Sequence, residues 1–101
     1  MEKDLRYIEL FEIYQGLLTD RQREIFSSYY CLDLSLSEIA EPDGNSRQSV
    51  YAVVKNVKAK LDEYEDKLGE YSKNQKLIFL ANEISKADKD ISQRILDIIG
   101  K

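Results

Sequence analysis

Apolar residues recur every three or four positions along most of this chain. The first such segment has Leu5, Ile8, Phe11 and Tyr14, and residues spaced in this way share one face of an α-helix. The same spacing returns further along, and we expect helices at about 4–15, 20–31, 35–41, 46–68, 72–86 and 88–99. Apolar spacing almost continues through 87–90, where we predict two helices rather than one. With one proline, four glycines and almost no hairpin signals, the sequence predicts an all-α fold.

Polar residues suited to capping stand at the predicted starts of three helices. Thr19 is followed three positions later by Gln22, and Ser35 is followed in the same way by Glu38. Each pair forms a capping box, in which the first side chain accepts from the backbone of the second and the second reaches back. Ser46 is a good N-cap for the long helix that follows it.

The segment from Ser35 to Lys60 holds a short helix, a turn and the start of a long helix. Pro42 makes helical geometry unfavourable for Glu41, and Gly44 tolerates the positive φ that a tight reversal needs. One helix therefore stops and another starts within about five residues. This pattern predicts a helix-turn-helix, the motif that fits the DNA major groove.

The face of the long helix opposite its apolar side carries residue types that read DNA. Arginine pairs with guanine, glutamine with adenine and alanine with the thymine methyl group, while lysine suits phosphates. The predicted contacts to duplex DNA are Arg47, Gln48, Ser49, Tyr51, Ala52, Lys55 and Lys58. The competing interpretation is a solvated helix face that binds nothing.

The long helix also carries a heptad seam, in which apolar steps of four and three alternate. Its members are Val50, Val54, Val57, Leu61, Tyr64, Leu68 and Tyr71. The first half can pack on the preceding helices, but Leu61, Tyr64 and Leu68 lie too far along, at about 1.5 Å of rise per residue, to reach them. Either the C-terminal helices fold back over this part, or a second subunit covers it. We expect a homodimer with these three residues at its interface.

The residue types that most often perform catalysis are scarce. The chain has no histidine and one cysteine, Cys31, which removes the usual triads, a Cys-rich zinc site and an intrachain disulfide. We therefore expect a protein that is not an enzyme and that uses no metal or cofactor. Cys31 itself is expected to be a half-buried small apolar residue.

Charge is distributed unevenly along the long helix. The net charge of −4 argues against indiscriminate binding to nucleic acid. Between Ser46 and Lys60, however, every charged residue is a cation, and the next charged residues are the acids Asp62, Glu63, Glu65 and Asp66. A negative segment beyond the basic one would limit how far this helix enters a groove.

Length and hydropathy set the expected organisation. A chain of 101 residues fits a single helix-turn-helix domain, 1–101, with a core at 1–68, the motif at 35–60 and a C-terminal helical extension at 69–101. No apolar run of about 18 residues and no signal peptide is found, so we expect a cytoplasmic protein without membrane insertion.

The first 70 residues or so resemble the YlxM-type family of small bacterial proteins, whose helix-turn-helix is similar to region 4 of sigma factors. The most specific matching elements are Glu38-Ile39-Ala40-Glu41, Ser46-Arg47-Gln48, Val50-Tyr51 and Tyr64-Glu65 with Lys67-Leu68. The chain departs from the family at Asp43 and Asn45, where the family places apolar residues.

The resemblance implies a DNA-binding regulatory protein that takes part in the signal recognition particle pathway, because the family's gene tends to lie beside that of the pathway's GTPase. The alternative is an accessory protein that binds this GTPase or its RNA and keeps the helix-turn-helix as a scaffold only. The expected partners are accordingly duplex DNA, components of the signal recognition particle and a second copy of the chain.

Overall fold

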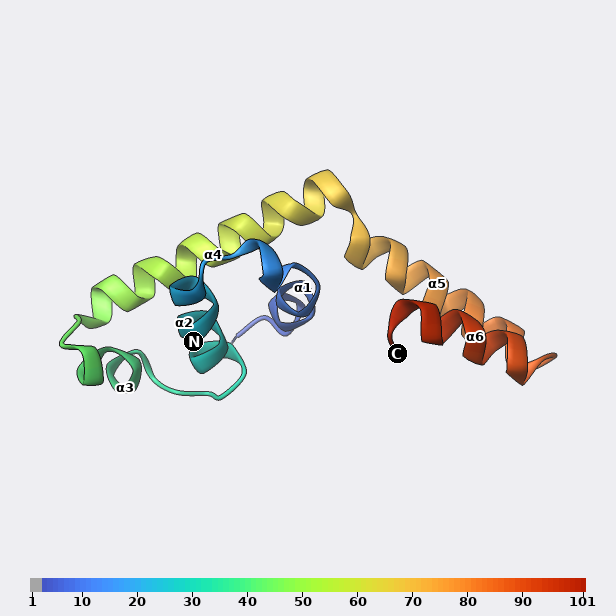
Figure 1. Cartoon of the computed structure of the whole chain (residues 1–101), viewed down its shortest axis with the longest axis horizontal. Coiled ribbons are helices and arrows are strands. Elements are labelled where there is room, and N and C mark those ends of the chain that lie inside the picture. Colours follow the sequence, from blue (N-terminus) through green and yellow to red (C-terminus); the bar gives the residue numbers. More distant parts are fainter. Residues whose placement is uncertain (1–2) are drawn as a thin grey trace. The chain divides into compact units, whose positions relative to one another are not determined.

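The computed structural model describes residues 3–101, which form two compact units, one ending at Lys67 and the other spanning Leu68–Lys101 (Figure 1). Among these residues there are α-helices and short 3₁₀ helices and no strand, so the predicted all-α fold is confirmed. The α-helices are α1 (Arg6–Tyr14), α2 (Asp20–Tyr30), α3 (Leu36–Ala40), α4 (Arg47–Leu68), α5 (Glu70–Ile84) and α6 (Lys89–Ile99). The 3₁₀ helices are η1 (Gln15–Leu17) and η2 (Glu41–Asp43).

The core of the first unit joins the apolar faces of its helices. Its largest fully buried side chains are Phe26, Leu10, Leu61, Val50 and Val57. Aromatic rings link α1 to α2, since Phe11 and Phe26 have ring centroids 5.1 Å apart. The apolar stripe of α4 thus faces this core, as its spacing predicts, and its opposite side is left to solvent.

Side-chain capping explains where α2, α3 and α4 start. The Thr19 hydroxyl accepts from the Gln22 backbone N–H at 3.2 Å while the Thr19 N–H donates to the Gln22 side chain at 2.9 Å. Ser35 and Glu38 make the same reciprocal pair at 3.1 Å in both directions. Both predicted capping boxes are confirmed. The Ser46 hydroxyl accepts from the N–H three residues on at 3.0 Å, as expected of an N-cap.

The turn of the motif differs from its prediction at one residue. Glu41 has helical angles, φ −57° and ψ −48°, so the expectation that Pro42 would keep it out of helical geometry is wrong. Pro42 lies in the first turn of η2, where its missing N–H costs no hydrogen bond. The reversal comes at Gly44, with φ 68°, and the Asn45 N–H donates to the Ala40 carbonyl at 3.0 Å. The predicted role of Gly44 is confirmed.

Helix α1 covers the part of the heptad seam, at Leu61 and Tyr64, that was expected to lie beyond the reach of the preceding helices. Leu61 is wholly buried, and the rings of Tyr14 and Tyr64 lie 5.9 Å apart between their centroids. The Tyr7 hydroxyl also donates to Asp62 at 2.8 Å. The argument that placed Leu61 beyond the reach of this unit was therefore wrong, because it ignored α1. Leu68, at the end of α4, remains 53% exposed.

The second unit is a helical hairpin. Gly69 has φ 64° and separates α4 from α5. The Asp88 carboxylate caps α6 by accepting from the backbone N–H groups of Asp90 and Ile91 at 3.0 and 3.1 Å. The prediction of two helices after Gly69 is confirmed. Where α5 and α6 meet, the buried Ser92 hydroxyl donates to the Ala81 carbonyl at 2.7 Å.

Candidate nucleic-acid interface

The face of α4 opposite the core presents the residues that were proposed to contact DNA. Six of the seven are solvent-exposed, namely Arg47, Gln48, Ser49, Tyr51, Ala52 and Lys55. The seventh, Lys58, is half-buried. This exposure follows from the burial of Val50, Val54 and Val57, which turn the other side of the helix to solvent. The face extends over about three turns.

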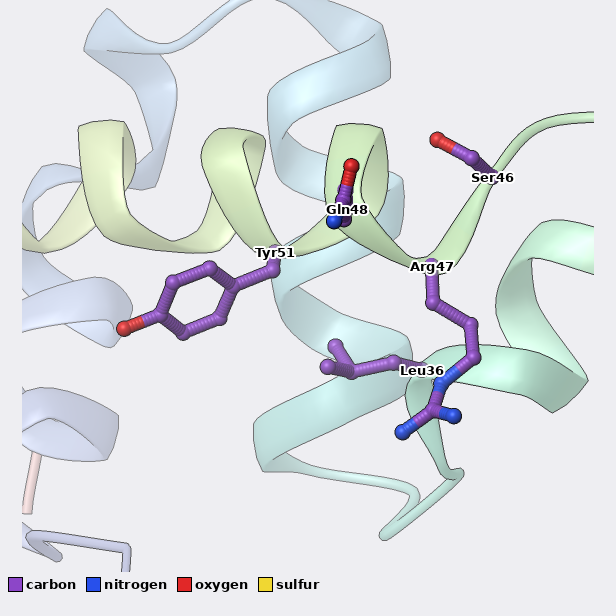
Figure 2. Close-up of a pocket in the computed structure, with 5 residues that line it drawn as sticks. All are labelled: Leu36, Ser46, Arg47, Gln48 and Tyr51. Atoms are coloured by element: carbon purple, nitrogen blue, oxygen red, sulfur yellow. The ribbon is translucent and has the colours of Figure 1, made fainter.

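A shallow depression lies at the start of α4 (Figure 2). It is lined by Ser46, Arg47, Gln48 and Tyr51, and by Leu36 from α3. Figure 2 shows the Arg47 guanidinium beside Leu36, so both helices of the motif contribute to one surface. Sequence reasoning missed Leu36, because its helical spacing gives no sign that it borders the face of another helix.

The polar side chains at this surface differ in whether they already form hydrogen bonds within the protein. Within residues 3–101, the Arg47 side chain makes no hydrogen bond or ion pair, and the same holds for Lys55. The Ser49 hydroxyl instead donates to the Ser46 carbonyl at 3.0 Å. Ser49 thus has its one side-chain hydrogen engaged in the first turn and can offer a ligand only an acceptor. The guanidinium is the stronger candidate for reading a base edge.

A small cavity of about 70 Å³ lies on the same side of α4, beside Tyr51. Three lysines line it, namely Lys3, Lys55 and Lys58. The remaining lining residues are aromatic or apolar: Tyr29, Tyr30, Tyr51 and Val54. The sequence pattern did not indicate Lys3 or Tyr29, which lie far from the motif along the chain. The surroundings favour an anion about the size of one phosphate group.

Two of the three lysines are positioned by aromatic rings. The Lys58 ammonium lies 5.0 Å from the centre of the Tyr7 ring, and the Lys3 ammonium lies 4.1 Å from the centre of the Tyr29 ring. Lys3 also forms an ion pair with Asp33 at 2.8 Å. Such cation–π contacts hold ammonium groups without neutralising them. Of the three lysines, Lys3 alone has a carboxylate partner among the described residues.

The acidic segment that follows the basic one is engaged in the fold. Burial, followed by a hydrogen bond to Asp62, raises the pKa of the Tyr7 hydroxyl to about 12. The Tyr14 hydroxyl donates to Glu65 at 2.7 Å. A hydrogen bond from Lys67 at 2.9 Å lowers the pKa of Glu63. These carboxylates therefore have partners on α1 or α4 itself, whereas the cations of the first turns face solvent.

Other kinds of site were also considered. Residues 3–101 contain no group of three His, Cys, Asp or Glu side chains placed to hold a metal ion. Cys31 is exposed rather than half-buried as expected, because it follows the last turn of α2 and points away from the core. None of the helices in the described part of the chain is both long and apolar enough to cross a bilayer.

Two capped helices joined by a tight turn, with an exposed polar face on the second, define a helix-turn-helix protein. A sequence model of the family described as "Putative helix-turn-helix protein, YlxM / p13 like" matches residues 1–99. The chain belongs to this family.

Relatives from bacteria support this assignment. A UPF0122 protein of Bacillus thuringiensis is 38% identical over 102 residues, which covers 98% of this chain and 93% of the relative. A UPF0122 protein of Symbiobacterium thermophilum is 43% identical over 86 residues, which covers 84% of this chain and 80% of the relative. The similarity extends well beyond the first 70 residues and includes the hairpin.

Proposed function

We propose that the first unit binds duplex DNA by placing the first turns of α4 in the major groove, and that the protein is a non-catalytic regulator of transcription in the cytoplasm. The observation that carries the proposal is the exposed and unpaired Arg47 side chain in the first turn of the motif's second helix. A charged, multidentate donor at this position is the type of group that reads a guanine edge.

The other residues of the face take roles that follow from their chemistry. Gln48 is placed beside Arg47 to contact a second base, and Ala52 leaves room for a thymine methyl group. Lys55 and Lys58 contact phosphates, and the cavity that they share with Lys3 receives one backbone phosphate. Tyr51 lies between the base-reading residues of the first turn and the phosphate-binding lysines, and it contacts the sugar-phosphate backbone.

The finer assignment concerns which genes are controlled. We propose genes tied to protein targeting by the signal recognition particle, on the basis of the family resemblance alone. The second candidate is an accessory protein that binds the targeting GTPase or its RNA. The net charge of −4 favours it, because so acidic a chain has a weak general attraction to DNA.

A titration of labelled mixed-sequence duplex DNA, followed by fluorescence anisotropy at two salt concentrations, tests the proposal. Arg47→Ala is expected to weaken binding about tenfold or more, since a bidentate base contact contributes about 1–3 kcal/mol. Arg94→Ala serves as the matched control, because it removes an exposed arginine from the hairpin instead. Affinity should also fall steeply with salt in the unmodified protein.

The proposal fails if binding is micromolar or weaker and does not respond to Arg47→Ala or Lys55→Ala. The same titration with RNA, and a pull-down with the targeting GTPase, then test the accessory function. Equal losses in Arg47→Ala and Arg94→Ala would indicate a general charge effect rather than a reading face.

A further inference from the structure

The hairpin formed by Leu68–Lys101 lacks a core of its own. Its buried residues are Ala81 and Ser92, both of them small. A unit of fewer than about 40 residues usually needs a disulfide, a metal or an oligomer to be stable. The chain's one cysteine lies in the other unit, and the described residues hold no metal-binding cluster. The remaining stabiliser is contact with a surface outside the hairpin.

Six of the large apolar residues of the hairpin lie on one side. Leu77, Leu80 and Ile84 follow one another at steps of three and four on α5, and Ile91, Ile95 and Ile98 at steps of four and three on α6. We call these six residues the hairpin face.

The two helices run antiparallel and meet along a line marked by the Ser92 to Ala81 hydrogen bond (Figure 1). At 100° per residue, the α5 members are rotated from Ala81 in the same sense as the α6 members are rotated from Ser92. In an antiparallel pair, residues rotated in the same sense from the contact line lie on the same side. The six residues therefore form one continuous apolar surface.

The hairpin face is well exposed. Ile98 is 86% exposed, Leu80 52% and Ile91 43%, and its other three members are half-buried. None of the six is charged. Contiguous apolar patches of this kind are rare on monomeric proteins and mark sites of association.

We propose that the hairpin face is a dimer interface, covered by the same face of a second copy so that two hairpins complete a four-helix bundle. Helices of such a bundle carry two adjacent apolar stripes, one facing the neighbour in the hairpin and one facing the opposite pair. Both α5 and α6 show this arrangement. An uncharged apolar face is also self-complementary about a two-fold axis, as an isologous dimer requires. The interface thus lies on α5 and α6, whereas the sequence had suggested Leu61 on α4.

The proposal does not depend on DNA binding, and light scattering on the full chain tests it. The unmodified protein is expected to have twice the mass of the 11.8 kDa chain at about 100 μM. Ile98→Glu and Leu80→Glu are expected to yield monomers and to raise the dimer dissociation constant at least tenfold. Phe79→Glu is the matched control: Phe79 is 65% exposed on α5 but lies about 160° around the helix from Ala81, away from the hairpin face.

Circular dichroism of each variant checks that the helix content of the chain persists. A monomeric unmodified protein overturns the proposal. In that case, slow hydrogen exchange of the α6 amides would indicate that the hairpin face is covered within the same chain. Fast exchange would indicate that the hairpin face is uncovered and binds a different protein. A dimer that survives Ile98→Glu, or that dissociates equally in Phe79→Glu, would place the interface elsewhere and so also overturn it.

Discussion

Tyr14 donates a hydrogen bond to Glu65 across 51 positions of the chain, at 2.7 Å. The bond is partly buried and joins the last turn of α1 to the acidic part of α4. It shows that this acidic part is held by the first unit's own N-terminal helix. The carboxylates there have a structural role, whatever their effect on DNA.

Replacing Tyr14 by phenylalanine isolates this bond. The ring stays in contact with Tyr64 while the hydroxyl is lost, so we expect the free energy of unfolding to fall by about 1.5–3 kcal/mol, as for hydrogen bonds to charged groups. Urea unfolding followed by circular dichroism measures it. Tyr51→Phe, which removes an exposed hydroxyl that has no hydrogen-bond partner within residues 3–101, should change stability by less than about 0.5 kcal/mol. Equal effects of the two variants would refute the structural role of the Tyr14 bond.

Alkaline pH should weaken the fold through Tyr7. Its pKa is raised from 10.0 to about 12 in the folded chain, mainly by burial and then by Asp62. The folded state therefore holds this proton more tightly than the unfolded state does. The resulting stability is fully present below pH 10 and is lost as the pH rises through about 12.

The measurement is urea unfolding at pH 9 and at pH 11, compared between the unmodified protein and Tyr7→Phe. We expect Tyr7→Phe to lose less stability than the unmodified protein over this interval. Part of the loss will remain, because burial also raises the pKa of Tyr30. An identical loss in both proteins would contradict the assignment to Tyr7.

Gly44 and Gly16 form a natural pair for testing backbone strain. Neither has an atom within 4 Å of the position that a Cβ would occupy, but Gly44 has φ +68° whereas Gly16 has no positive φ. We expect Gly44→Ala to destabilise the protein by about 1–2 kcal/mol and Gly16→Ala to be neutral or to stabilise it by up to about 1 kcal/mol. Thermal unfolding of both variants decides the matter, and a harmless Gly44→Ala would mean that the turn takes another conformation.

If the first unit binds DNA as proposed, Lys55 should contribute through a phosphate. Lys55→Gln is expected to reduce the slope of log affinity against log salt by about 0.9, the value for one released counterion. Lys60→Gln is the control on the same helix, since Lys60 lies about 140° around α4 from Lys55 and does not line the lysine-rich cavity. If the salt slope changes equally in both variants, Lys55 contributes no more to phosphate binding than Lys60 does, which contradicts the prediction.

Local signals in the sequence predicted the helix starts well. Capping boxes such as Ser35 with Glu38 act over three residues, so the residues that make the structure stand side by side in the chain. The seam from Val50 to Val57 was also predictable, because its period directly defines a buried face. The exposed residues of the candidate site followed from the same projection.

Features that depend on distant segments were not predictable in this way. The burial of Leu61 depends on where α1 packs, which no periodicity in α4 encodes. The same reason hid Lys3 and Leu36 from the candidate site, since each comes from another segment and meets α4 only in the folded chain. The conformation of Glu41 was predicted wrongly because the general preference of a residue before proline for extended geometry was applied. The 3₁₀ helix that begins at Glu41 and holds Pro42 in its first turn was not foreseen.

The continuity of α4 has a mechanical consequence. It is one uninterrupted helix from Arg47 to Leu68, roughly 33 Å long, with its candidate reading residues near one end and its clamps to α1 near the other. The helix is held along its length, by the buried Val50 and Val54 near the Arg47 end and by α1 near the other end. Because Tyr7 bonds to Asp62 and also packs against Lys58, a shift of α1 would move the acidic part of α4 and the Lys58 edge of the candidate face together.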